Sequence, residues 1–178
     1  MKNILDNSIN YDIIKNGDLM KKVSCNDILS LDNNEQQKVI KQVRQLMEKR
    51  YPNFVDWFDN KLIPGIFTGQ RNIVFISKGN KIISFANLTK KAREKKITNI
   101  YISSCFKHRQ FFDVLVDKSL DWLETDKPVV IIPRNDLPMC FDGIYDRKWV
   151  LTDKTKNDDY ILNRKEFFNV NIKKKVHK

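Results

Sequence analysis

The chain has 178 residues, of which 41% are apolar and 31% are charged. That length supports one domain with a full hydrophobic core, and that composition excludes both a membrane-spanning protein and a disordered polar chain. The net charge of +11 attracts anions such as nucleic acids, CoA-like phosphates or acidic protein surfaces.

The N-terminus and the cysteines indicate neither export nor a metal site. The N-terminal sequence MKNILDNSINYDIIKNGD places acids and asparagines where a signal peptide needs an apolar segment, so we expect a cytoplasmic protein with no membrane contact. Cys25, Cys105 and Cys140 are too widely spaced to be paired metal ligands, and the only histidines are His108 and His177. We therefore expect reduced thiols and no metal.

The first part of the chain predicts one strand followed by two helices. Residues 30–52 carry an apolar stripe at helical spacing that opens with the cap pair Asp32 and Glu35. A shorter helical stretch begins at residue 53, and we expect it to end near residues 64–65, a Pro-Gly pair.

The spacing of apolar residues then changes from a helical period of 3.6 residues to a strand period of 2, which indicates a β-sheet. Two apolar runs around the turn sequence SKGN predict a hairpin over 71–90, and an antiparallel third strand over 96–104 follows a lysine-rich turn. A helix over about 109–124 leads to a short buried strand over 128–133, which this crossover makes parallel to the third strand. Three further elements are expected: a short helix over 134–146 and strands over 148–153 and 158–168. The order predicts a single mixed α/β domain in three layers.

This order of elements resembles the GNAT superfamily of acyl-CoA N-acyltransferases over roughly residues 35–155. The segment KKITNIYISSCFKHRQFFDVLVDKSLDWLETDKPVVIIP resembles the strand, pyrophosphate loop, helix and strand that hold acyl-CoA. YPNFVDWFDNKLIPGIFTGQRNIVFI resembles the first two helices, and FDGIYDRKWVLTD lies where the family has a helix and a strand. The resemblance implies a GNAT-like domain over 1–163, with a mostly antiparallel sheet, one parallel pair and flanking helices. A basic tail over 164–178 follows it.

The same resemblance implies transfer of an acetyl or other acyl group from CoA to an amine. In the family's loop pattern, Lys107 keeps the first cation, whereas Gln110 and Phe112 replace the two small residues. The implied cofactor contacts are Ile102, Ser104, Lys107, His108, Arg109, Gln110, Phe111 and Phe112. The family's tyrosine proton donor corresponds to Tyr145.

The helical stripe predicts that Phe112 points into the core and that Gln110 and Phe111 face the loop. Side chains of Lys107, His108 and Arg109 would then supply the anion contacts that glycine backbone supplies elsewhere.

Two other functions remain open. The chain could be a GNAT-fold binding or regulatory module that has lost acetyl-CoA, because the loop glycines are absent. It could also bind RNA or DNA by stacking bases on aromatic residues, for which the candidates are Tyr101, Phe106, Phe111 and Trp149. For the enzyme, the basic surface fits a polyanionic acceptor such as tRNA, or an acidic protein.

Overall fold

A computed structural model describes residues 9–15, 18–48, 51, 54–104, 109–155 and 160–162. The strands are β1 (Ile9–Lys15), β2 (Asp18–Asp27), β3 (Arg71–Lys78), β4 (Lys81–Lys91), β5 (Glu94–Ile102), β6 (Val129–Ile132), β7 (Leu151–Lys154) and β8 (Tyr160–Leu162). The helices are α1 (Asn33–Glu48), α2 (Phe54–Trp57), α3 (Ile63–Phe67), α4 (Arg109–Leu123) and α5 (Leu137–Asp146). Three short helical segments are η1 (Ile28–Ser30), η2 (Phe58–Leu62) and η4 (Arg134–Asp136). The predicted boundary between domain and tail at residue 163 lies outside the described residues.

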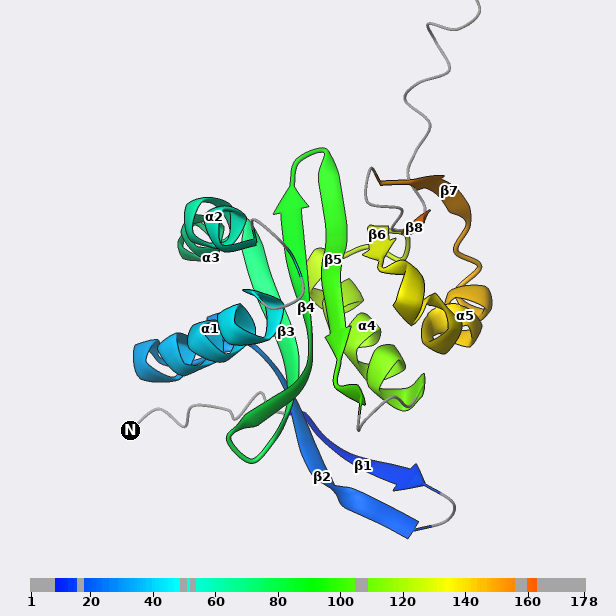
Figure 1. The fold of residues 1–178 in the computed structure, drawn as a ribbon, viewed down its shortest axis with the longest axis horizontal. Helices are drawn as coiled ribbons and strands as arrows, with labels where there is room; N and C mark the ends of the chain where they lie inside the picture. The colour runs from blue at the N-terminus through cyan, green and yellow to red at the C-terminus, as the bar shows by residue number, and fades with distance from the viewer. Residues whose placement is uncertain are drawn as a thin grey trace, which may run out of the picture.

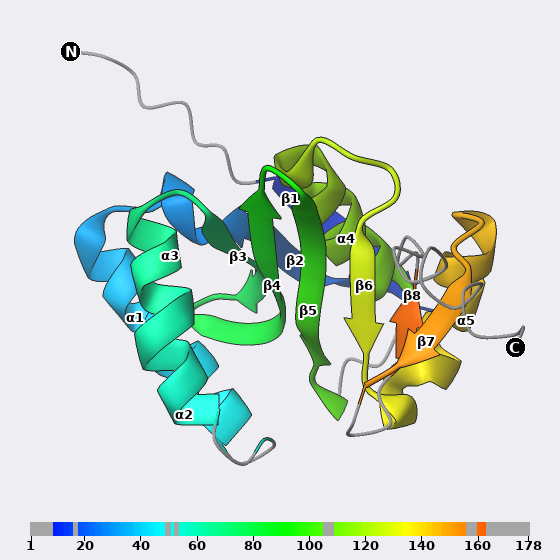
Figure 2. The same ribbon diagram turned by 90° about the horizontal axis from the view of Figure 1, so that it is seen from above.

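The eight strands that the structure describes form one sheet in the order β1–β2–β3–β4–β5–β6–β8–β7. All neighbours are antiparallel except β5 and β6, which run parallel and are joined through α4 (Figure 2). The predicted hairpin, third strand and parallel pair are therefore confirmed. Only one strand was expected before the first helix, whereas the structure has the hairpin β1–β2. Within it, β2 pairs with β3 only over residues 24–27, so the rest of the hairpin projects beyond the sheet (Figure 1).

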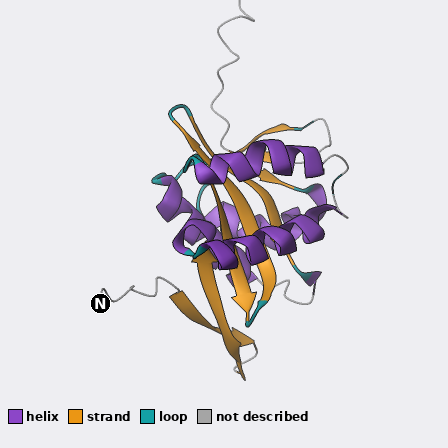
Figure 3. Cartoon of the chain, turned by 90° about the vertical axis from the view of Figure 1, so that its left-hand side faces the viewer, coloured by secondary structure: helices purple, strands orange, loops and turns teal. Residues whose placement is uncertain are grey.

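Helices cover both faces of the sheet and complete the three predicted layers (Figures 1 and 3). Helices α1–α3 bury their apolar stripes on one face against β3 and β4, around Phe58, Phe75 and Phe85. Helices α4 and α5 pack on the other face with Leu115 and Ile144. The sheet is thus buried on both sides in its centre, as the burial of β3 and β4 requires.

The cap predicted for the first helix is present. The carboxylate of Asp32 accepts a hydrogen bond of 2.8 Å from the backbone N–H of Glu35, which satisfies one of the open donors at the start of α1. The second helical stretch differs from expectation, because it does not end at the Pro-Gly pair. Pro64 lies in the first turn of α3, where its missing N–H costs no hydrogen bond, and α3 continues to Phe67.

Candidate functional site

The expected cofactor site lies where β5 hands over to α4. Ile102 is the last residue of β5 and is buried in the core beneath α4, and Ser104 follows it. Lys107 and His108 lie outside the described residues, so their predicted anion contacts stay predictions. Arg109 is the first residue of α4.

At this edge β5 separates from its parallel neighbour. The two strands pair only at Lys96 with Val129 and at Ile97 with Val130. Beyond Val130, β6 keeps its partner β8 on the other edge, at residues 131 and 132, while β5 continues to Ile102 without a further pair to β6. In open α/β sheets, ligands bind beyond the carboxyl ends of neighbouring strands, where the backbone groups are free of ladder partners. The separated ends of β5 and β6 therefore form the candidate site.

A β-bulge marks the point of separation. Between the pairs Phe85–Tyr101 and Asn87–Thr98, β5 has two residues against one in β4, and Asn99 has φ +50°. Asparagine tolerates this left-handed conformation better than most residues, which explains its presence. Asn99 accepts a 3.3 Å hydrogen bond from the side-chain amide of Asn87.

The carbonyl oxygen of the Asn87 side chain has an unusual environment. The side chain is buried, and within the described part of the chain its Oδ1 has no hydrogen-bond partner. A buried acceptor without a donor costs about 1–3 kcal/mol, and such groups concentrate at functional sites. Neither asparagine was predicted to belong to the site; the only available signal was an asparagine inside a strand pattern, where this residue type is depleted.

The first turn of α4 shows where the two phenylalanines point. Phe112 is buried as predicted, and its ring lies against Gly143 of α5. Phe111 was expected to face the loop, but it is also buried in the core on the α4 side of the sheet. The correction has a simple cause: burying a second benzyl group is worth about 2 kcal/mol or more, and this outweighs any need for a loop contact. Gln110 is exposed as expected.

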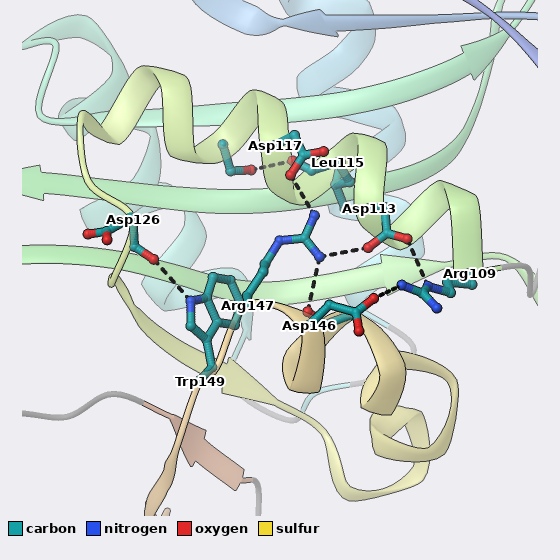
Figure 4. A network of polar contacts seen from close by, with 10 residues as sticks. Arg109, Asp113, Leu115, Asp117, Asp126, Asp146, Arg147 and Trp149 are labelled. Carbon is teal, nitrogen blue, oxygen red and sulfur yellow. Dashed lines mark hydrogen bonds and ion pairs between the residues drawn. The ribbon is translucent and has the colours of Figure 1, made fainter.

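Arg109 is engaged by carboxylates rather than open to an anion (Figure 4). Its Nε lies 3.1 Å from Oδ2 of Asp113, one turn along α4, and its Nη2 bonds Asp146 of α5. Asp142 lies 3.8 Å from its Nη1. The hydrogen bonds that Arg109 donates to Asp146 and Asp113 raise the pKa of its guanidinium. The guanidinium that was predicted to meet the diphosphate thus holds α4 and α5 together.

Arg147, just after α5, makes a second bridge to α4 (Figure 4). It donates to Asp113 at 2.7 Å, to Asp117 at 2.5 Å and to the carbonyl of Gly143 at 3.0 Å. Burial lowers the pKa of Arg147, but its hydrogen bonds to Asp117 and Asp113 outweigh that effect and raise it overall. Together the network has four carboxylates and two guanidiniums, a net charge of −2 beside the start of α4. Nothing in the sequence pattern signalled it, because its partners come from two helices.

Two further residues bear on proton transfer, Tyr145 and Glu94. Tyr145 is exposed on α5, two residues from Gly143 and therefore about 200° around the helix from the side that meets α4. Its role as proton donor stays a prediction. Glu94 lies in the basic turn between β4 and β5, where a hydrogen bond from Lys96 lowers its carboxyl pKa, so it is a poor base near neutral pH.

The basic turn is partly used to hold the end of α4. Lys90 bonds the carboxylate of Glu124 at 2.8 Å and the carbonyl of Trp122 at 3.1 Å, and Lys95 bonds the carbonyl of Glu124 at 2.7 Å. These cations complement the negative end of the helix dipole. Two of the lysines that looked free for a polyanion therefore have a structural role.

Metal ligands, membrane-spanning helices and exposed aromatic residues are the remaining features to describe. Among the described residues, no group of His, Cys, Asp and Glu is placed to hold a metal, and no helix is long and apolar enough to cross a bilayer. Of the aromatic residues proposed to stack on bases, Phe111 and Trp149 are buried in the core and Tyr101 stacks on Phe85 at 5.2 Å. Phe106 lies outside the described ranges. Core packing thus explains the three that the structure describes.

Neither a scan against protein-family models nor a search of curated proteins finds a match. Solved structures do match. An acetyltransferase of the GNAT family from Staphylococcus aureus aligns with a TM-score of 0.54 at 9% identity, over 79% of this chain and 96% of its own. The N-acetyltransferase PaiA of Thermoplasma acidophilum, in complex with coenzyme A, aligns with a TM-score of 0.51 at 11% identity and the same coverage. The N-acetyltransferase PseH of Campylobacter jejuni, in complex with acetyl coenzyme A, has a TM-score of 0.50 at 10% identity, again over 79% and 96% of the two chains. The chain therefore has the fold of the GNAT acetyltransferases, as the sequence predicted.

Proposed function

We propose that the protein transfers an acyl group from acyl-CoA to an amine. The observation that carries this proposal is the separation of β5 from β6 after Ile97 and Val130, directly beside the bulge at Asn99. It separates the carboxyl ends of two parallel strands, where open α/β sheets bind ligands, in a fold shared with structures that hold coenzyme A or acetyl coenzyme A.

The residues at this junction suit the extended arm of acyl-CoA better than its diphosphate. Ile102 ends β5 and Ser104 lies two residues after it, and in the proposal their backbone lines the extended arm of the cofactor. The diphosphate would meet Lys107, His108 and Arg109, but Arg109 is paired with Asp113 and Asp146 and must leave them to bind phosphate. We therefore expect binding that is weaker than an unoccupied arginine would give.

In the proposed reaction, the amine nitrogen bonds to the acyl carbon as the carbon–sulfur bond breaks, and a proton moves from the amine to the departing sulfur. A well-placed proton donor is worth about 10²–10⁴ in rate. Tyr145→Phe should thus lower kcat by about 100-fold or more if Tyr145 is that donor. A change of less than about twofold would assign the proton to another group.

The Arg109 network favours a second candidate, a GNAT-fold binding module that does not take CoA. A net charge of −2 beside the helix start repels a diphosphate, and α5 lies against α4 through Phe112 and Gly143. If this candidate is correct, the helix junction is purely structural.

Calorimetric titration and thermal shift with acetyl-CoA decide between the two. Ligand at 100 times its Kd should stabilise the protein by ~2.7 kcal/mol, and each kcal/mol should raise Tm by about 2–4 °C at this size. No shift at millimolar acetyl-CoA would support the binding module and refute the enzyme.

Charge variants locate the phosphates. Lys107→Ala combined with Arg109→Ala should abolish the shift. Asp146→Asn frees Arg109 from one carboxylate, and since a charge-assisted bond is worth about 1.5–3 kcal/mol, affinity should rise about tenfold. Asp121→Asn is the matched control, because it removes the same charge from an exposed position of α4. Equal gains in both variants would show a general charge effect and not release of Arg109.

A further inference from the structure

Helix α5 and the strand after it expose an unusual set of large apolar side chains. Phe141 is 59% exposed and Tyr145 75%, and Val150 and Leu151 are 62% and 52% exposed. We call these four residues the α5–β7 patch. Single exposed apolar residues are ordinary, but four within eleven positions indicate a surface that something covers.

Chain geometry limits how far apart the members of the patch can lie. Phe141 and Tyr145 are four residues apart on α5 and are neighbours on one helix face. Val150 lies five residues after Tyr145, so their Cα atoms are at most about 19 Å apart. β7 runs on directly from the turn after α5 (Figure 2).

Acidic side chains flank the aromatic part of the patch. Asp142 and Asp146 stand one position further along α5 than Phe141 and Tyr145, and both are exposed. They belong to the Arg109 and Arg147 network, whose net charge is −2. In a chain of net charge +11, Asp142 and Asp146 are exposed carboxylates that would attract the cations of a basic, apolar segment.

The chain itself supplies such a segment at this place. The last described residue, Leu162, pairs directly with Leu151 of the patch across β7 and β8. The following residues read NRKEFFNVNIKKKVHK, in which four polar or charged residues lead to two phenylalanines and then to a lysine run. Sixteen residues span at most about 55 Å when extended, which is enough to run from Leu162 over the patch.

We propose that residues 163–178 dock in cis on the α5–β7 patch. Phe167 and Phe168 cover the apolar side chains, and the lysines at 173–175 face Asp142 and Asp146. The docking and its test need no cofactor, although the patch includes Tyr145, the candidate proton donor of the proposed acyl transfer.

The covalent link between the tail and the domain sets what fraction of the tail is docked. A short flexible linker holds its end at an effective concentration of about 1 mM, so an intrinsic Kd of ~0.2 mM would keep the tail about 80% docked. A protease that cuts only the undocked tail would then be slowed about fivefold, because it samples the open fraction alone.

The test is native-state cleavage of the full chain by a lysine-specific protease, with cuts at residues 173–175 quantified by mass spectrometry. We expect Phe141→Ser to accelerate these cuts about fivefold. Asp142→Lys should do so too, since it reverses a charge that makes only a 3.8 Å contact with Arg109. The control is Phe67→Ser on α3, which is 69% exposed and outside the patch, and which should leave the rate unchanged.

Three outcomes would overturn the proposal. Cleavage of the unmodified protein at the rate of a free peptide of residues 163–178 would show that nothing holds the tail. Protection that disappears on tenfold dilution would assign the patch to the tail of a second copy. Protection that arises only on adding RNA, equally in all variants, would assign the tail to a polyanion.

Discussion

The contact between Gly143 and Phe112 sets how closely α5 approaches α4, and substitution at Gly143 tests it. A Cβ at this position would lie 2.7 Å from two ring carbons of Phe112 and 2.9 Å from Oδ1 of Asp113. Carbon atoms pack best at about 3.5–4.0 Å, so the ring or the helix must move by about 1 Å. Phe112 is fully buried, which leaves its ring little room.

Two opposing effects decide the sign of Gly143→Ala. Alanine in a helix interior is more favourable than glycine by about 0.8–1 kcal/mol. Overpacking a filled core costs about 1–3 kcal/mol. We expect the free energy of unfolding to fall by about 1 kcal/mol in the unmodified protein, but to rise by ~0.5–1 kcal/mol in a Phe112→Leu background, where the shorter side chain leaves space.

Urea unfolding followed by circular dichroism measures the change in the free energy of unfolding in both backgrounds. The dependence of that free energy on urea concentration, the m value, should stay constant between variants. Phe111→Leu is the matched control background, because Phe111 is equally buried but does not face Gly143. There, Gly143→Ala should destabilise as it does in the unmodified protein. The reasoning fails if Gly143→Ala stabilises the unmodified protein, or if its effect is the same in all three backgrounds.

Two buried thiols, the bulge residue and the tail each give a further test. Burial raises the pKa of the Cys25 and Cys140 thiols from 9.0 to about 12. As the pH rises, these thiols therefore lose protons in the unfolded state before they do so in the folded state. Urea titrations should show the free energy of unfolding falling above about pH 9, by up to ~1.4 kcal/mol per pH unit for each thiol. The fall should be smaller in Cys25→Ala and Cys140→Ala. At Asn99, whose φ is positive, glycine should cost about 1 kcal/mol for the hydrogen bond lost from Asn87, and valine should cost about 1–2 kcal/mol more because it adds backbone strain, by the same assay. If the tail binds tRNA, affinity falls with salt along a line of log K against log salt concentration. Removing residues 164–178 should reduce the steepness of that line by about 0.9 for each phosphate that the tail neutralises; an unchanged slope would exclude the tail from RNA binding.

Local periodicity accounts for what could be predicted. The stripe in α1, the SKGN turn and the crossover helix before β6 each depend on neighbours in sequence, and the structure has all of them. The hairpin β1–β2 had no comparable signal, because asparagines and lysines interrupt its apolar pattern. Its pairing is fixed instead by the contact of β2 with β3.

The candidate site was less predictable because its decisive contacts join distant residues. The pattern placed Arg109 at the start of a helix, but it could not show Asp146, 37 positions later, meeting it. Phe111 was assigned to the loop on helical phase alone, and the sheet beneath α4 took it into the core. Gly143 was visible as a helix-interior glycine, a residue that usually has a packing reason there, yet only the fold reveals Phe112 as that reason.

The two proposals meet at Asp142 and Asp146. These carboxylates hold Arg109, the cation that a diphosphate at the start of α4 would need. Lysines of a docked tail would neutralise the same carboxylates and weaken their hold on Arg109, so docking should favour anion binding. Acetyl-CoA should accordingly bind the unmodified protein more tightly than Phe141→Ser, by up to about fivefold, while Phe67→Ser should match the unmodified protein. Calorimetry on the three full-length chains measures this. Equal affinities, in a protein whose tail is protected from cleavage, would mean that the tail covers α5 without reaching the carboxylates that bind Arg109.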